Sequence, residues 1–443
     1  MTWKYRSHEL TESSAASSRW KPGLYRGRRF RLGCRFFVWH GSPHHDNSLF
    51  PEFVFGVTPA FRSPGTSMKI IIVGTAFPLR GGIAHYNALL AAELGKRHTV
   101  ETITFKRQYP KFLFPGKTQE EAGGEPGVGP APQLIDSINP LNWLNVARRV
   151  RAMKPDLLVF KYWLPFFGPC FGTIAKHVKR GTQTRVLYIC DNVIPHEQRP
   201  GDRSFTRYAF SAADFFVVQS DAVERDLKSF WPKARYKKVP HPVYNFFGKG
   251  KDKAAARASL GITAERVLLF FGYVRRYKGL HVLLEAMAIV VRSLDAKLMV
   301  VGEFYDDEEK YRKQISRLGL YEHVILKSDY VPNDRVGVYF SAADVVVLPY
   351  ISATQSGIAQ IAYNFDRPVI ATDVGGLGEV VRDMVTGFLV PHDDPTALAQ
   401  SIIRFYGEER EPEFAANVRQ EKRKYTWEAM VNAIEELVTG EIP

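Results

Sequence analysis

The stretch from residue 267 to residue 279 reads VLLFFGYVRRYKG and carries the clearest fold signal in the chain. Its first five residues, Val267 to Phe271, are apolar without alternation, which is typical of a strand buried on both faces of a parallel sheet. Glycine and cations follow at Gly272, Arg275 and Lys278, before a helical pattern begins. Loops at the carboxyl ends of parallel strands bind ligands, and Arg and Lys suit a diphosphate. We therefore predict a phosphate-binding loop here, with a solvated basic loop as the alternative.

The same alternation of buried strands and amphipathic helices extends in both directions from this stretch, which predicts right-handed βαβ units and parallel sheets. The fold class is therefore α/β, with two Rossmann-like doubly wound parallel-sheet domains facing each other across a cleft. The predicted strands are Lys69–Val73, Leu157–Phe160, Val186–Cys190, Phe215–Val218, Val267–Phe271, Leu298–Val301, Val324–Leu326, Val345–Leu348 and Val369–Thr372. The predicted helices are Ile83–Leu94, Leu141–Met153, Gly168–Lys179, Leu280–Val291 and Glu413–Val438.

The pattern divides the chain of 443 residues into five parts. Residues 1–67 are rich in Ser, Arg, Pro and Gly, and we expect them to be poorly ordered; either they are a targeting segment, or the protein starts at Met68. A first domain over 68–245 and a second over 259–420 are joined by a linker at 246–258. The last part, 421–443, belongs to a C-terminal helix that either returns to the first domain or ends on the second.

Composition excludes several classes of protein. Apolar residues make up 45% and charged residues 24% of the chain, which is ordinary for a globular protein. No apolar run is long enough to span a membrane. The three cysteines, Cys34, Cys170 and Cys190, are too few for a disulfide framework or a zinc site, and they fit a reducing cytoplasm. Of the net charge of +14, +6 lies in residues 1–67, and no nucleic-acid motif accompanies it, so we expect no nucleic-acid partner.

Three further loops carry ligand-type residues. Gly81 and Gly82 follow the first strand, where a helix begins and His85 lies on its first turn, although a tight turn without a ligand is the alternative. Their spacing is not G-x-G-x-x-G, which disfavours NAD. The second loop reads Thr354-Gln355-Ser356-Gly357, where Ser356 can cap a helix whose free N–H groups would hold a phosphate. The third loop contains Gly375, Gly376 and Glu379.

The first domain offers candidate acid–base groups after the strand that ends at Cys190. Asp191, His196 and Glu197 crowd this strand end, although a lone histidine here is about as often structural. The aromatic stretch 160–171, broken by Lys161, is interpreted as core, with a membrane-resting patch as the alternative. The chain contains no D-x-D triplet, so cationic side chains and helix N-termini would have to neutralise a diphosphate, and we predict no metal site.

From Met68 onward the chain resembles the GT-B-fold glycosyltransferases of family 4, the group 1 type. Three features carry the likeness: the Arg80-Gly81-Gly82 loop, the G-x-x-x-x-x-K-G spacing from Gly272 to Gly279, and the run from Pro368 to Glu379. The resemblance implies a retaining, metal-independent transferase without a cofactor, which moves a sugar from a nucleoside diphosphate sugar to a glycan or lipid-linked acceptor. It also implies that the donor binds the second domain and the acceptor the first, in a cytoplasmic protein of polysaccharide biosynthesis.

Site residues follow from the resemblance by position. Lys278 matches the diphosphate lysine, Arg275 stands in for an arginine replaced by Tyr273, and Ser356 and Gly357 match the phosphate cradle. The complete predicted donor set is Gly81, Gly82, Arg275, Lys278, Thr354, Gln355, Ser356, Gly357, Gly375, Gly376 and Glu379. The predicted catalytic set is His85, Asp191, His196 and Lys278, with the acceptor bound near the first three.

One departure from the family is marked. Its two glutamates, seven residues apart, correspond to Ala353 and Ile361 or to Thr354 and Ala362, and neither pair is acidic. Thr354, Gln355 and Gln360 would offer neutral hydrogen bonds instead, in a variant subgroup with a T-Q-S-G loop. Three alternatives stay open at this point: a nucleotide-sugar epimerase of the same fold, a non-catalytic nucleotide-sugar-binding scaffold, and a lipid-binding protein. Peripheral contact with the inner membrane surface is a further expectation.

Overall fold

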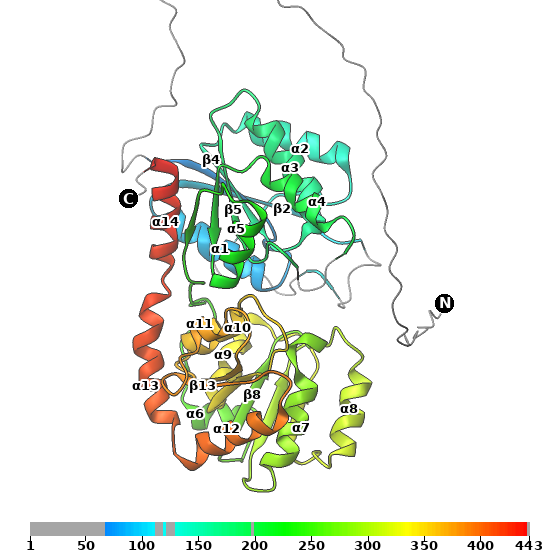
Figure 1. Ribbon diagram of the computed structural model, residues 1–443, viewed down its shortest axis with the longest axis vertical. Helices are drawn as coiled ribbons and strands as arrows, with labels where there is room; N and C mark the ends of the chain where they lie inside the picture. The colour runs from blue at the N-terminus through cyan, green and yellow to red at the C-terminus, as the bar shows by residue number, and fades with distance from the viewer. Residues whose placement is uncertain (1–66, 111–117, 121–128, 196–198, 441–443) are drawn as a thin grey trace, which may run out of the picture. The chain divides into compact units, whose positions relative to one another are not determined.

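A computed structural model describes residues 67–110, 118–120, 129–195 and 199–440 of the chain (Figure 1). These residues belong to one compact unit, Thr58–Pro443. The predictions that concern residues 1–66, His196 and Glu197 lie outside the described residues. Within them, the chain forms two parallel sheets, each covered by helices, as the sequence predicts.

The first sheet has seven strands in the order β3-β2-β1-β4-β5-β6-β7, and neighbouring strands run parallel. Ile70 and Ile72 of β1 join a buried cluster with α1, whereas Ile71 and Val73 join a second cluster with α2 and α3. Both faces are therefore covered by helices, which explains the unbroken apolar strands. The strands are β1 (Lys69–Val73), β2 (Thr99–Arg107), β3 (Gln133–Asp136), β4 (Leu157–Tyr162), β5 (Arg185–Cys190), β6 (Phe215–Val218) and β7 (Tyr236–Lys238). The helices are α1 (Gly82–Leu94), α2 (Pro140–Ala152), η2 (Pro165–Phe167), α3 (Gly168–Lys179), α4 (Asp202–Phe210) and α5 (Asp221–Phe230); we call this part the first lobe.

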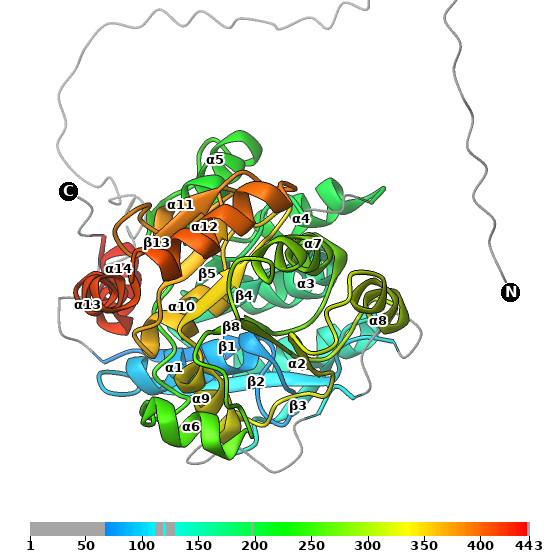
Figure 2. The ribbon, with the colours of Figure 1, turned by 90° about the horizontal axis from the view of Figure 1, so that it is seen from below.

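The second sheet has six parallel strands in the order β10-β9-β8-β11-β12-β13. Figure 2 shows helices on both of its faces, α7 and α12 on one and α9 and α10 on the other. The strands are β8 (Val267–Phe271), β9 (Lys297–Val301), β10 (Val324–Lys327), β11 (Val345–Leu348), β12 (Val369–Thr372) and β13 (Gly387–Val390). The helices are α6 (Lys253–Ser259), η3 (Arg276–Lys278), α7 (Leu280–Val290), α8 (Glu308–Arg317), α9 (Asn333–Ala342), α10 (Gly357–Asn364), α11 (Leu377–Val380) and α12 (Pro395–Gly407); we call this part the second lobe. Helix α6 begins within the stretch predicted as a linker.

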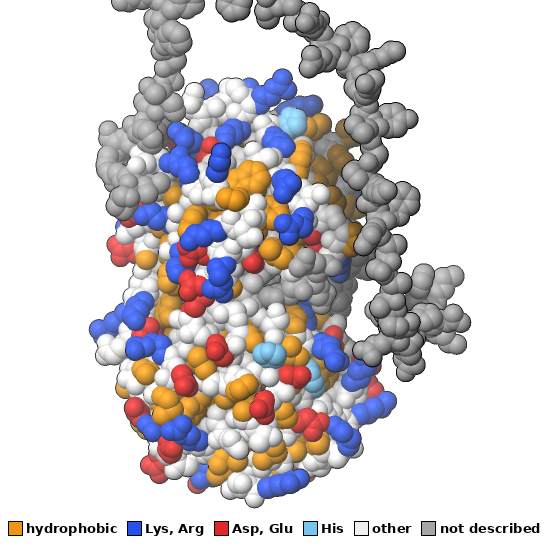
Figure 3. Space-filling model, in the orientation of Figure 1, with side chains coloured by type: hydrophobic (Ala, Val, Ile, Leu, Met, Phe, Trp, Pro, Cys, Tyr) orange, Lys and Arg blue, Asp and Glu red, His pale blue; other side chains and the backbone are white. Residues whose placement is uncertain are grey.

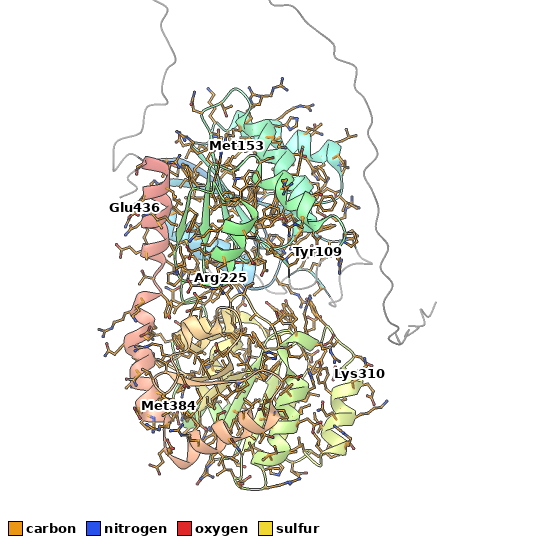
Figure 4. The ribbon with its side chains drawn as sticks, in the orientation of Figure 1. Tyr109, Met153, Arg225, Lys310, Met384 and Glu436 are labelled. Carbon is orange, nitrogen blue, oxygen red and sulfur yellow. The ribbon has the colours of Figure 1, made fainter. Side chains whose placement is uncertain are left out.

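The C-terminal segment is not the single helix that the sequence predicts. It forms α13 (Glu411–Glu421), η4 (Lys422–Lys424) and α14 (Trp427–Thr439), because the backbone turns at Tyr425 and the hydroxyl of Thr426 caps a new helix. Figure 1 shows α14 beside α1. The Trp427 indole donates to the Val243 carbonyl at 2.9 Å, and Glu436, labelled in Figure 4, pairs with Lys237 of β7. Helix α14 thus packs on the first lobe.

The aromatic stretch after β4 belongs to the core of the first lobe. Phe160, Phe167 and Phe171 are fully buried and contact one another with ring centroids 5.0 to 5.6 Å apart. The core interpretation is therefore confirmed, and the membrane-patch alternative for these residues is wrong. Across the described ranges, no helix has both the length and the apolar character needed to cross a membrane.

Candidate active site

Lys278 lies buried at the carboxyl end of β8, in the short turn η3. A Cβ on Gly272 would lie 3.3 Å from Lys278 Nζ and 3.2 Å from Ile358 Cδ1, so the ammonium group lies near the first turn of α10. Burial, and secondly the charge of Arg275, lower the pKa of Lys278 to about 8. No carboxylate among the described residues pairs with it. A buried cation without a paired anion is a candidate site for an anionic ligand.

The backbone holds the β8 loop tightly against the β11 loop. Gly279 has φ of 69°, and a Cβ there would lie only 1.8 Å from the Pro349 carbonyl oxygen, so only glycine fits. The Ile351 amide also donates to the Tyr277 carbonyl at 2.7 Å. These contacts fix the position of Lys278 relative to the start of α10.

Helix α10 begins as the sequence predicts. The Ser356 hydroxyl accepts a hydrogen bond from the Ala359 amide at 3.4 Å, which makes Ser356 the cap of this helix. A Cβ on Gly357 would lie 3.2 Å from the Tyr244 ring. The structure therefore brings Lys278, Ser356 and Gly357 together, as an anion site at a helix N-terminus requires.

Arg275 occupies a more open position than Lys278. Its side chain is exposed, and its guanidinium carbon lies 5.0 Å from the centroid of the Tyr305 ring. Burial raises the pKa of Tyr109 in the first lobe, which is labelled in Figure 4. The positive charge of Arg275 opposes that rise, so Arg275 lies close enough to act on the first lobe. Arg275 is placed to meet a ligand from the open side of the loop.

Gly375, Gly376 and Glu379 have packing roles in this structure. A Cβ on Gly375 would lie 1.6 Å from the Ala353 carbonyl oxygen, and one on Gly376 2.4 Å from that of Thr354. The Glu379 carboxylate accepts the Asp221 amide at 2.8 and 2.9 Å, at the start of α5. Burial raises the pKa of Glu379. These residues shape the Thr354 loop, and their contact with a donor stays a prediction.

Gly81 of the first lobe lies opposite a second-lobe residue, and Gly82 contacts Tyr244. Gly81 has φ of 110°, and a Cβ there would lie 3.7 Å from the Tyr273 hydroxyl. The Tyr244 hydroxyl donates to the Gly82 carbonyl at 3.2 Å. Because Tyr244 also contacts Gly357, it lies between the glycine loop of the first lobe and the start of α10.

Asp191 is the centre of a buried polar network at the carboxyl edge of the first sheet. Its carboxylate accepts Lys161 Nζ at 2.6 Å and the Gln355 amide of the second lobe at 2.6 Å. Lys161 also donates to Gln219 at 3.0 Å and lies over the Tyr86 ring, with Nζ 3.5 Å from its centroid. The carboxylate is therefore held in one orientation, facing the second lobe.

The neighbouring hydroxyl of the T-Q-S-G loop contacts the same region. Thr354 donates to the side-chain oxygen of Asn192 at 2.6 Å. Both Thr354 and Gln355, predicted as donor-binding residues, thus bond to the first lobe in this structure. The side-chain oxygen of Gln355 accepts no hydrogen bond from any residue that the structure describes, which leaves one acceptor for a ligand.

His85 lies deeper than the other candidates. Its ring stacks on Phe246 at 5.1 Å and meets the edge of Phe247 at 5.4 Å. Burial lowers the pKa of His85 to about 4, so the ring is neutral at pH 7. A catalytic role for His85 stays a prediction, and such a role would have to use the neutral imidazole.

Several residues at this site were not identified from the sequence. Lys161 interrupts an apolar strand, and that interruption was the signal that could have marked it as the partner of Asp191. Gln219 and Tyr244 follow other strands without any distinctive motif. Arg80 was noted only as part of a glycine loop, but its guanidinium donates to Glu303 of the second lobe at 2.5 Å.

Comparisons with known proteins bear on this geometry. Residues 265–408, which include the β8 and β11 loops, match the family model described as "Glycosyl transferases group 1". Within the second lobe, this stretch is similar to that family. Among curated relatives, the D-inositol 3-phosphate glycosyltransferase of Corynebacterium urealyticum is 28% identical over 256 residues, which are 55% of this chain and 60% of that protein. The protein of the same name from Streptomyces griseus is 31% identical over 228 residues, 46% of this chain and 48% of that protein. The chain thus spans about half to three-fifths of the length of these curated relatives.

Solved structures share the whole two-sheet arrangement. Sucrose-phosphate synthase from Thermosynechococcus elongatus matches with a TM-score of 0.65 and 20% identity, covering 84% of this chain and 98% of that one. Anabaena HepE, solved in complex with UDP and glucose, matches with a TM-score of 0.67 and 17% identity, covering 84% and 100%. The chain therefore has the GT-B fold.

Proposed function

We propose that this group 1 protein is a glycosyltransferase that moves a sugar from a nucleoside diphosphate sugar to an acceptor hydroxyl. The observation that carries the proposal is the buried ammonium group of Lys278 beside the N-terminus of α10, which pairs with no carboxylate in the described part of the chain. A diphosphate leaving group gains negative charge in the transition state, and a fixed cation and amide dipoles stabilise that charge. The names of the relatives, all glycosyltransferases, support the same reaction class.

The proposed mechanism assigns one task to each lobe. Lys278, with Arg275 on the open side, holds the diphosphate of the donor, and this positive charge serves in place of a metal ion. The acceptor binds the first lobe near Asp191, whose carboxylate accepts a hydrogen bond from the attacking hydroxyl. Attack occurs from the face that the diphosphate leaves, a phosphate oxygen takes the proton, and the anomeric configuration is retained. Retention and metal independence rest on the family resemblance.

A second candidate is a binding scaffold without catalysis. The observation in its favour is that Ala353 and Ile361, at the positions of the family glutamates, are apolar and buried. Thr354 and Gln355 are, in addition, bonded to Asn192 and Asp191 of the first lobe. A scaffold would bind the nucleotide and release it unchanged.

A binding and turnover screen tests the proposed function. We expect GDP, UDP or ADP to raise the melting temperature of the full chain, because a ligand that binds only the folded state stabilises it. We also expect slow release of the nucleoside diphosphate from the matching sugar donor. Binding with no release on any donor and acceptor would favour the scaffold, and no binding by any of the three would contradict both candidates.

We further propose that the acceptor is lipid-linked and reached from an anionic membrane surface. Helices α2 and α3 carry five Lys and Arg residues and no acidic residue. Near them, Leu141 and Ile138 are 74% and 43% exposed. Figure 3 shows Lys and Arg prevailing on the upper half of the displayed face, around exposed hydrophobic side chains. Basic groups interspersed with apolar ones favour binding to anionic lipid headgroups.

Neutralising α2 should weaken vesicle binding. Arg148, Arg149 and Arg151 are exposed, and each basic residue near an anionic surface contributes about 1 kcal/mol. Replacing all three with Gln should therefore reduce binding to phosphatidylglycerol vesicles by about 100-fold, as measured by co-sedimentation. The matched control removes Lys310, Lys313 and Arg317 from α8 of the second lobe and should leave binding unchanged. Equal losses in the two triple variants would contradict a surface localised to the first lobe.

A further inference from the structure

Arg80 of the first lobe inserts its guanidinium between two second-lobe residues. Its Nη2 donates to Glu303 Oε2 at 2.5 Å, and the two side chains are only 5% and 3% exposed. Its Cζ lies 4.5 Å from the centroid of the Tyr330 ring, in a cation–π arrangement. The Nε donor of Arg80 has no hydrogen-bond partner within the described ranges. A planar group that donates to a carboxylate and lies over an aromatic ring thus occupies this position.

Glu303 is held at the same sheet edge as Lys278. It follows β9, and its carbonyl accepts the Val274 amide of the β8 loop at 2.9 Å. The preceding residue, Gly302, has φ of 142°, and a Cβ there would lie 2.2 Å from the Gly272 carbonyl oxygen. The β8 and β9 loops are therefore pressed together, and the carboxylate of Glu303 is placed by backbone contacts and not by Arg80 alone.

The order of the strands arranges these groups in a row. Tyr330 follows β10, Glu303 follows β9, Lys278 follows β8, and Gly357 follows β11, and these four strands are consecutive in the sheet. Gly272, where a Cβ would lie 3.3 Å from Lys278 Nζ, also contacts Gly302, so Glu303 and Lys278 flank the same glycine. A nucleotide whose diphosphate contacts Lys278 has a ribose of suitable length to bring its base to Glu303 and Tyr330.

We infer that Glu303 and Tyr330 bind a guanine base, which makes the donor of the proposed reaction a guanosine diphosphate sugar. Guanine presents two adjacent donors, N1–H and the 2-amino group, in the same N–C–N arrangement as the guanidinium of Arg80. Uracil, cytosine and adenine each place an acceptor beside their donor, and that acceptor would face the carboxylate unfavourably. Aromatic rings also bind bases by stacking, and Tyr330 offers such a ring. Arg80 occupies the base site in the present structure and is displaced by the nucleotide.

This inference rests on the proposed function and adds the identity of the base. The inferred base differs from that of HepE, whose structure contains UDP. HepE is only 17% identical to this chain, so the likeness shows the fold alone. A site built to hydrogen-bond one polar edge discriminates strongly against ligands that lack it.

The first test uses the wild-type chain and isothermal titration with GDP, inosine diphosphate, UDP and ADP. GDP should bind most tightly, and inosine diphosphate, which lacks the 2-amino group, should bind about 10-fold more weakly. Tight binding of UDP or ADP in preference to GDP would overturn the guanine assignment while the proposed function stands. Binding of none of the four would overturn both.

The second test changes which hydrogen-bonding edge of the base residue 303 can recognise. In Glu303→Gln, the amide oxygen accepts N1–H but the amide nitrogen now donates, which suits xanthine, whose C2 position carries an oxygen. GDP should therefore bind about 10- to 100-fold more weakly and xanthosine diphosphate more tightly than in the wild type. Arg80→Ala is the matched control and should keep the preference for GDP over UDP. If the two variants lose GDP affinity equally, without a gain for xanthosine diphosphate, Glu303 serves only as the partner of Arg80, and the assignment is wrong.

Discussion

Lys278→Met should lower turnover of the sugar donor by about 10²–10³-fold, the loss seen when one group that stabilises transition-state charge is removed. The ammonium group is buried next to Gly272 and Ile358, so no bulk cation can replace it. The same substitution should leave the melting temperature of the ligand-free protein unchanged or higher, because an unpaired charge is no longer buried. Donor hydrolysis and thermal unfolding, measured on the same preparation, check both effects.

The pH dependence of binding provides an internal control. Burial places the pKa of Lys278 at about 8, below its ordinary value of 10.5, so the side chain loses its proton as the pH rises through 8. Affinity for a diphosphate should be constant below that pH and fall by about tenfold per unit above it. The Lys278→Met variant should show no such fall. Lys313→Met, at a side chain that is 76% exposed, should behave as wild type. A variant of Lys278 with full turnover would refute its role.

Lys161→Met should destabilise the first lobe by about 3–5 kcal/mol, because it leaves the buried carboxylate of Asp191 without its cation. The side chain of Lys161 is 2% exposed and that of Asp191 15% exposed, so water replaces the lost contact only in part. Burial itself lowers the pKa of Lys161, whereas Asp191 opposes that shift. Chemical denaturation at pH 7, monitored by fluorescence, measures the loss.

Two further variants test whether the loss of stability comes from the Lys161–Asp191 contact. Lys161→Met combined with Asp191→Asn should recover much of the lost stability, because neither charge is then buried alone. Lys228→Met removes an exposed partner of Glu224 and should cost less than about 1 kcal/mol. If the single and the exposed-pair variants were equally stable, the Lys161–Asp191 contact would contribute nothing measurable.

The strands that carry the fold were predictable because they are buried on both faces. Val267–Phe271 and Phe215–Val218 have the predicted bounds, and each is entirely buried. Strand β2 was missed because charged and apolar residues alternate along it, and β7 because it consists of one tyrosine and two lysines. Local sequence identifies an element when burial is complete, and it fails when pairing with neighbouring strands is what orders the backbone.

The candidate site was predictable to the extent that its residues lie on neighbouring loops. Lys278 and Ser356 could be placed together because both follow strands of one parallel sheet. The pairing of Arg80 with Glu303 could not, because the two residues are 223 positions apart and belong to different lobes. Gly375 has the features of a ligand-binding glycine, but the absence of a side chain there makes room for the Ala353 carbonyl. Sequence reveals that a glycine is needed, whereas only the fold reveals what approaches it.

Helix α14 also has a consequence for how the protein is made. It packs on α1 through the contact between Trp427 and Tyr86, with ring centroids 5.0 Å apart, yet it is the last described helix to leave the ribosome. Domains generally fold as units during synthesis, starting from the N-terminus. Here the apolar surface of α1 that α14 covers stays exposed while the second lobe is translated. The nascent chain therefore presents an apolar surface to chaperones until α14 covers it.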